Sequence, residues 1–148
     1  YPDPFKVVLA RYLHPSFSEA IMDIAIYPVL APLTGDTEQL ISHELEDAVE
    51  QARQITVERA MAMEIKKHQQ AFSQGESSLQ GVMSEIAAEG ESGEALYATI
   101  YIFRLEDKFV KFSTTFPSRI GDPLVSEALT QLAVPGESAL MKELRKAL

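Results

Sequence analysis

The amino-acid sequence predicts an α+β fold, with an antiparallel sheet of about six strands flanked by two main helices at about 36–58 and 122–133. Several short segments alternate apolar and polar residues, as strands with one buried face do. Two longer segments repeat apolar residues at helical spacing behind a capping residue. The strands follow one another through short polar turns, which favours antiparallel pairing with the helices packed on the faces of the sheet.

Two strands are predicted near the N-terminus, at residues 6–13 and 19–27. The apolar residues of the second strand share one face: Ala20, Met22, Ile24 and Ile26. Pro28 ends this strand, because proline lacks the N–H group that a central strand donates to its neighbour. We therefore expect the even-numbered residues of the second strand to face the core.

The first main helix is predicted to begin at Asp36, a good N-cap residue, with Gln39 placed to complete a capping box. Apolar residues then recur at helical spacing: Leu40, Ile41, Leu45, Val49, Ala52 and Ile55. Such a stripe is typical of a helix that covers a sheet, and we expect the helix to reach about Glu58.

The segment from Met61 to Phe72 has two interpretations. Its Ala, Met, Glu, Lys and Gln residues all favour a helix, which would continue the preceding one to an unusual length. Met61, Met63 and Ile65 also alternate, and on this ground we favour a strand. Residues 79–88 form a further predicted strand, between two polar segments rich in glycine and serine.

A hairpin is predicted from the alternating, β-branched and aromatic segments 96–103 and 108–116. If the even-numbered apolar residues of both segments face one core, the loop between them must contain three residues. Ile100 then pairs with Phe112, whereas a two-residue loop would place Ile100 opposite Ser113.

The second main helix is predicted to begin with Asp122 as its N-cap and Pro123 as its first residue. Its inner face carries Leu124, Val125, Ala128, Leu129 and Leu132. The Pro135-Gly136 pair would end it. Residues 1–134 are therefore expected to form a single α+β domain, and residues 135–148 a C-terminal helical tail.

Composition excludes several classes of protein. The 148 residues suit one domain, and 46% apolar with 24% charged residues is a globular composition. The net charge is −9 and the 13 Lys and Arg residues are scattered, which argues against nucleic-acid binding. The longest apolar run is interrupted by Pro28, so we expect no membrane insertion. There is no cysteine and no glycine-rich phosphate loop, and we expect no cofactor.

Three parts of the sequence carry a resemblance to a group of known proteins: the strand DIAIYP at residues 23–28, the helix after it, and LYATIYIFRLEDKFVKFSTTFP at residues 96–117. Together they resemble uncharacterised bacterial exported α+β proteins whose arrangement is similar to the PsbP-like sandwich. The resemblance covers about half of the chain and implies a periplasmic or extracellular location, with the cytoplasm as the alternative. Tyr1 in place of Met agrees with a processed or trimmed chain.

Catalytic and metal-binding motifs are absent from the sequence. His14, His43 and His68 are not spaced as zinc ligands, so we expect no metal site. No serine stands in a nucleophile motif, and we assign no catalytic residue. The first main helix carries many carboxylates, as expected for the solvent-exposed face of a helix that covers a sheet.

A candidate partner-binding surface is an aromatic patch with one cation on the hairpin: Tyr97, Tyr101, Phe103, Phe109 and Lys111. Exposed aromatic patches mark interaction surfaces. The other interpretation, which we favour, is that a helix covers these residues and makes the sheet two-sided. Because no local catalytic motif is present, we favour a non-catalytic envelope or extracellular domain that recognises a protein or a small apolar ligand. The alternative function is a hydrolytic enzyme that uses dispersed carboxylates.

Overall fold

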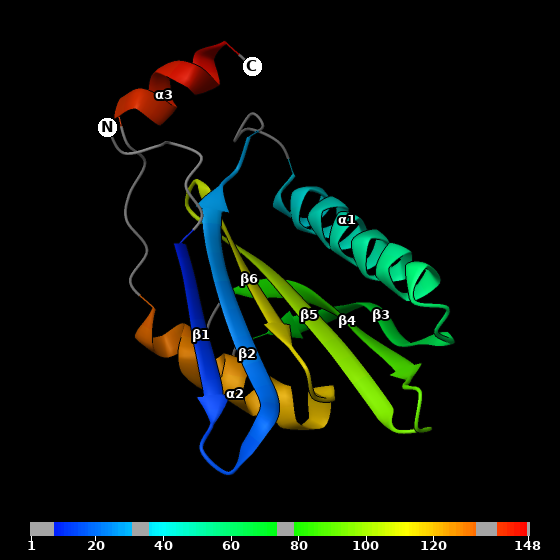
Figure 1. Ribbon diagram of the computed structural model, residues 1–148. Coiled ribbons are helices and arrows are strands. Elements are labelled where there is room, and N and C mark those ends of the chain that lie inside the picture. The colour runs from blue at the N-terminus through cyan, green and yellow to red at the C-terminus, as the bar shows by residue number, and fades with distance from the viewer. Residues whose placement is uncertain (1–7, 31–35, 74–78, 133–138, 148) are drawn as a thin grey trace.

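The computed structural model describes residues 8–30, 36–73, 79–132 and 139–147, which form a six-stranded antiparallel sheet and three helices (Figure 1). The α+β class and the strand number are those the sequence predicts. The strands are β1 (Val8–His14), β2 (Phe17–Pro28), β3 (Met63–Ser73), β4 (Gln80–Glu89), β5 (Ala95–Leu105) and β6 (Lys108–Thr114). The helices are α1 (Thr37–Glu58), α2 (Ser118–Gln131) and α3 (Ala139–Lys146). None of them is long and apolar enough to cross a bilayer.

The sheet runs in the order β1-β2-β6-β5-β4-β3, and α1 and α2 lie on its opposite faces (Figure 1). Each face therefore has its own buried layer. The layer under α1 is mostly aliphatic: Val82, Ile86, Ile100, Ile102, Ile41, Leu45 and Val49, with Phe109. The layer under α2 is rich in rings: Phe72, Tyr101, Phe103 and Phe112, with Ile24, Ile26, Met83, Val110, Val125 and Leu129. Three of the ring pairs in the α2 layer meet edge to face, at centroid distances of 5.2–5.9 Å.

Helix α1 begins and ends as the sequence predicts. The Asp36 side chain accepts a hydrogen bond from the Glu38 N–H, so it caps the helix. Ile41, Leu45 and Val49 are buried against the sheet. The apolar stripe therefore does what its spacing predicts, and the solvent side of the helix carries most of its carboxylates.

The segment after α1 is a strand, which confirms the favoured interpretation of Met61–Phe72. Strand β3 pairs with β4, but two irregularities, after Ile65 and after Lys67, shift its register. Gln69 sits in the second irregularity with φ of 53°. These bulges interrupt the regular pairing of β3 with β4.

The hairpin of β5 and β6 is confirmed, but the predicted three-residue loop is wrong. Leu105 pairs with Lys108 around a two-residue turn, and Glu106 adopts a left-handed φ of 57°. Ile100 is therefore opposite Ser113. The argument from the even-numbered apolar residues had rejected this register. That argument assumed a single buried face. Because both faces are buried, the even-numbered residues of β5 face α1 while those of β6 face α2.

The predicted start of the second main helix is also wrong. Helix α2 begins five residues earlier, at Ser118, with Pro117 as an N-cap that offers no side-chain hydrogen bond. Pro123 lies inside the helix rather than at its first position, and Asp122 is not the cap. The predicted stop at Pro135-Gly136 lies outside the described residues.

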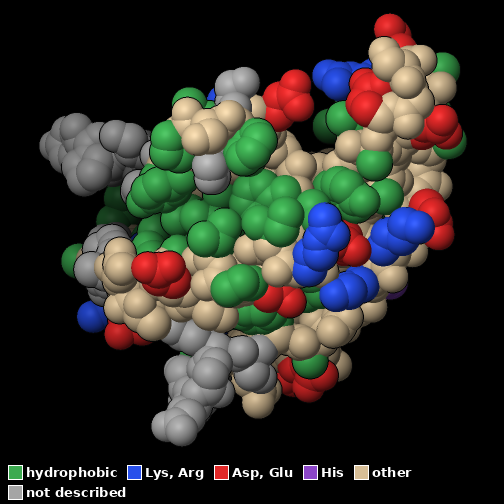
Figure 2. Space-filling model, turned by 90° about the horizontal axis from the view of Figure 1, so that it is seen from below, with side chains coloured by type: hydrophobic (Ala, Val, Ile, Leu, Met, Phe, Trp, Pro, Cys, Tyr) green, Lys and Arg blue, Asp and Glu red, His purple; other side chains and the backbone are tan. Residues whose placement is uncertain are grey.

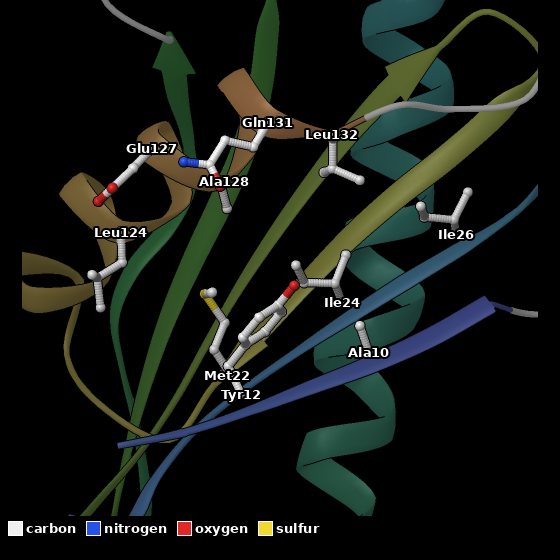
Figure 3. A pocket seen from close by; sticks show the side chains of 10 residues that line it. All are labelled: Ala10, Tyr12, Met22, Ile24, Ile26, Leu124, Glu127, Ala128, Gln131 and Leu132. Atoms are coloured by element: carbon white, nitrogen blue, oxygen red, sulfur yellow. The ribbon is translucent and has the colours of Figure 1, made fainter. Parts of the chain in front are cut away.

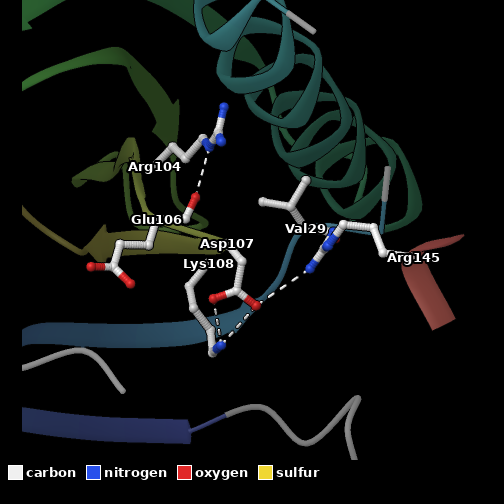
Figure 4. Close-up of polar contacts among 6 residues, drawn as sticks. All are labelled: Val29, Arg104, Glu106, Asp107, Lys108 and Arg145. Carbon is white, nitrogen blue, oxygen red and sulfur yellow. Dashed lines mark hydrogen bonds and ion pairs between the residues drawn. The ribbon is translucent and has the colours of Figure 1, made fainter. Parts of the chain in front are cut away.

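Helix α3 is tied to the turn between β5 and β6 (Figure 4). Its Arg145 guanidinium donates a hydrogen bond to the Val29 carbonyl oxygen and lies 3.3 Å from the Asp107 carboxylate. Lys108 also contacts that carboxylate, at 2.8 Å. Asp107 is 1% exposed, and the two cations compensate its buried charge. Residues 139–146 are thus an anchored helix.

Candidate functional site

An apolar groove of about 570 Å³ lies between the β1–β2 hairpin and α2 (Figure 3). Its sheet wall consists of Ala10 and Tyr12 of β1 with Met22, Ile24 and Ile26 of β2. Its helix wall consists of Leu124, Glu127, Ala128 and Gln131 of α2, followed by Leu132. We call this feature the apolar groove.

The sequence builds the sheet wall by simple alternation. In β2, Met22, Ile24 and Ile26 all point to the α2 side, as their even spacing predicts. Ala10 and Tyr12 extend this face onto β1, where Ala10 pairs with Ile24. The small Ala10 side chain leaves room that a larger residue would fill.

Hydrophobic side chains remain exposed around the groove. Figure 2 shows a broad hydrophobic patch on the face where Figure 1 places α2 and the β1–β2 turn. Tyr12, Leu13 and Phe17 near this turn are 56%, 60% and 66% exposed. On α2, Ile120 and Leu124 are also more than one-third exposed. Contiguous exposed apolar surface is a feature that many binding regions share.

Helix α2 is anchored at its N-terminal end, away from the groove. The Glu85 carboxylate of β4 accepts a 2.5 Å hydrogen bond from the Ser118 N–H. This charge takes the place of a local N-cap, because an anion at a helix N-terminus is favourable. Lys67 of β3 donates to the Ser118 hydroxyl at 2.7 Å.

A second tie joins β5 to the same end of α2. The Tyr101 hydroxyl donates a 2.5 Å hydrogen bond to the Asp122 carboxylate. Burial raises the pKa of Tyr101, and the bond to Asp122 raises it further, so the phenol remains a donor over the physiological range. Gly121 makes this approach possible, since a Cβ there would lie 2.6 Å from the Tyr101 oxygen.

The structure does not bring the predicted partner-binding residues together on one surface. Tyr101 and Phe103 are fully buried under α2, whereas Phe109 is buried in the layer under α1. Lys111 lies over the ring of Tyr27, 6.0 Å from its centroid, and Tyr27 in turn bonds Glu44 of α1. Tyr97 is half-buried near the start of β5.

The predicted three-residue loop would also have paired Phe103 with Phe109 and Tyr101 with Lys111, and that pairing is wrong. Phe103 pairs with Val110 and Tyr101 with Phe112, not with Phe109 and Lys111. The structure shows the other interpretation of these residues, a two-sided sheet with a helix on each face.

One polar cluster has the residue types of a hydrolase triad. His68 of β3 lies 3.2 Å from the Ser84 Oγ through Nδ1 and 2.7 Å from the Glu46 carboxylate through Nε2. Ser84 is 0% exposed, however, and its Oγ also accepts a hydrogen bond from the Gln69 N–H. A substrate would have no access to this oxygen. The cluster instead fixes β3 and its bulge to α1, and Gln69 reinforces it by donating to Glu46.

Sequence reasoning located both walls of the groove but not the groove itself. The inner face predicted for the second main helix was wide, since it included the adjacent pairs Leu124–Val125 and Ala128–Leu129. In the structure Val125 and Leu129 are buried, while Leu124 is exposed on the groove. An apolar stripe too wide to be buried as a whole was the sequence feature that could have indicated a groove. Within the described ranges, no group of three His, Asp or Glu side chains converges as a metal site requires.

Comparison with protein-family models and with curated proteins finds no match for this chain.

Proposed function

We propose that this domain is a non-catalytic binding module of the bacterial envelope or extracellular space, and that the apolar groove holds a small apolar ligand. The observation that carries the proposal is the concave groove itself. Small-ligand sites are clefts of about 300–1,000 Å³ lined mainly by apolar side chains with a few polar groups. The groove fits this description in volume and in lining, with Tyr12, Glu127 and Gln131 as its polar residues.

A small molecule suits the groove better than a protein surface does. Protein interfaces are broad, whereas here a strand pair and a helix form two facing walls. The exported location and the likeness to the PsbP-like sandwich rest on the sequence resemblance. The alternative of a hydrolase with dispersed carboxylates receives less support, because Glu127 is the one carboxylate among the described groove residues.

The binding test uses N-phenyl-1-naphthylamine, a neutral apolar fluorophore whose emission rises in an apolar site. We expect saturable binding to the protein, and we expect Ala10→Phe to weaken it at least about tenfold by filling the groove. Ala71→Phe is the matched control, because Ala71 is exposed on the opposite edge strand, β3. Absence of saturable binding, or equal binding by Ala10→Phe, would overturn the proposal.

A further inference from the structure

The described residues that line the apolar groove carry one formal charge, and it is negative. Of its ten lining residues, Glu127 is the one that carries a formal charge, and Tyr12 and Gln131 add neutral hydrogen-bonding groups. Glu127 and Gln131 are one helical turn apart, and both side chains extend from the groove side of α2 (Figure 3). Glu127 is exposed, so it stands where the groove meets water.

One basic residue, Arg119, lies in the first turn of α2, eight residues before Glu127, and does not line the groove. Arg11 and Lys67 are engaged elsewhere. Arg11 alternates with Ala10 and Tyr12 and therefore lies on the other face of β1. There it binds Asp23 through two hydrogen bonds of 2.8 and 2.9 Å, which hold the pKa of Asp23 below its usual range. Lys67 donates to Ser118 at the far end of α2.

A ligand with an anionic head would therefore meet an unfavourable site. Its carboxylate would lose water and face Glu127, and no Lys or Arg is among the described residues that line the groove. The net charge of −9 on the whole chain adds a long-range field that repels anions and attracts cations. A cationic head would gain from both effects.

We infer that the ligand of the apolar groove is a cationic amphiphile, with a single alkyl chain along the apolar walls and an amine head at Glu127. This inference rests on the proposed function and specifies the ligand's chemical class. Ala10, Met22, Ile24 and Ala128 would contact the chain, and Gln131 and Tyr12 would offer hydrogen bonds to the head.

The test compares three amphiphiles with the same ten-carbon chain: decylamine, which is protonated at neutral pH, decanol and decanoate. Isothermal titration at low salt, below the micellar concentration, should give affinities in that order. We expect each step to be about threefold, the size of an exposed charge interaction. Raising the salt concentration should bring the three affinities together.

The deciding variant is Glu127→Gln. It should narrow the gap between decylamine and decanol, because the amine loses its pairing with the Glu127 carboxylate and keeps only the attraction of the chain's net charge. Glu91→Gln is the matched control, because it removes the same charge from the exposed turn between β4 and β5. It should preserve the order of the three affinities.

The two levels of the hypothesis fail differently. If all three amphiphiles bind equally, or if decanoate binds best, the inference of a cationic head is wrong while the groove remains an apolar binding site. If Glu127→Gln leaves the preference for decylamine unchanged, Glu127 does not select the head and the inference is again wrong. If none of the three binds, the proposed function fails and the inference fails with it.

Discussion

The two faces of the sheet differ in how closely a helix can approach them. The backbone of α1 lies close to strands β3, β4 and β5, whereas that of α2 stands further from every strand. The side chains between helix and sheet account for the difference. Valine and isoleucine dominate the layer under α1, while Tyr101, Phe103 and Phe112 hold α2 away. On the β1–β2 side of this layer, the gap under α2 remains unfilled and becomes the apolar groove.

The helices also differ in how they are fastened. Helix α1 makes polar contacts with the sheet at two places. Arg104 donates a hydrogen bond to Thr37 at the start of the helix, and Gln69 and His68 contact Glu46 near its middle. On helix α2, the hydrogen bonds to Glu85 and Tyr101 both lie at the N-terminal end. The contacts of α1 thus reach the middle of that helix, whereas these two contacts of α2 hold the end that lies away from the apolar groove.

The largest expected effect is a contrast between two leucines. Leu45→Ala on α1 should lower the free energy of unfolding by about 2–5 kcal/mol, because Leu45 is fully buried and its removal leaves a cavity. Leu124→Ala on α2 should lower it by about 0.5 kcal/mol or less, since Leu124 is 42% exposed on the groove. Urea titrations of both variants measure the contrast. Equal losses would mean that α2 covers its face as completely as α1 does.

A smaller effect concerns the close contact that fixes the start of α2. Gly121→Ala should cost about 1–3 kcal/mol, because the new Cβ would lie 2.6 Å from the Tyr101 oxygen. In a Tyr101→Phe background that oxygen is gone, and the next nearest atoms are at 3.5 and 3.6 Å. There the same substitution should be stabilising by roughly 0.5–1 kcal/mol, since alanine favours a helix. A double-mutant cycle measures this change of sign, and additive effects would contradict the anchoring role.

The smallest effect is a pH dependence on the α1 side. Hydrogen bonds from Gln69 and the neighbouring His68 lower the pKa of Glu46 from its ordinary value of 4.5. A lowered folded-state pKa means that this stabilisation is complete above about pH 4.5 and is lost as the pH falls through the lowered value. The difference in unfolding free energy between the wild type and Glu46→Gln, below about 1 kcal/mol for so exposed a group, should therefore shrink in acid.

The control for this measurement is Glu58→Gln, an exposed carboxylate on the same helix. It reports the general effect of removing one negative charge from α1. A difference for Glu46→Gln that stayed constant from neutral pH to about pH 3 would show that Glu46 does not stabilise the fold through its charge.

Local patterns in the sequence predicted the elements well. Asp36 caps α1 from the adjacent position in the chain, and the alternation of β2 assigns Met22, Ile24 and Ile26 to the correct face. Both signals depend on neighbours in sequence, which is why they can be read without a structure. The preference for a strand at Met61–Phe72 depended on the same kind of alternation and was confirmed.

The errors arose where the determining contact is distant in sequence. Helix α2 begins at Ser118 because Glu85, on another strand, supplies the missing cap. The turn register followed from burial of both faces of the sheet, which the composition of β5 and β6 alone does not distinguish from one buried face. The groove depends on the distance at which the aromatic rings hold α2 from the sheet, and the packing of the whole layer sets this distance.

The ladder between β2 and β6 joins parts of the chain that are far apart, since Met22 pairs with Thr114. The hairpin β1–β2 and the run from β3 to β6 each pair neighbours in sequence, so both can form early in folding. Closing the long loop between β2 and β6 carries the larger entropic cost and comes later. One wall of the groove belongs to each side of this ladder, because α2 follows β6 directly. The groove can therefore form only once the β2–β6 ladder has joined its two walls, so we expect a ligand of the groove to slow unfolding more than it speeds refolding.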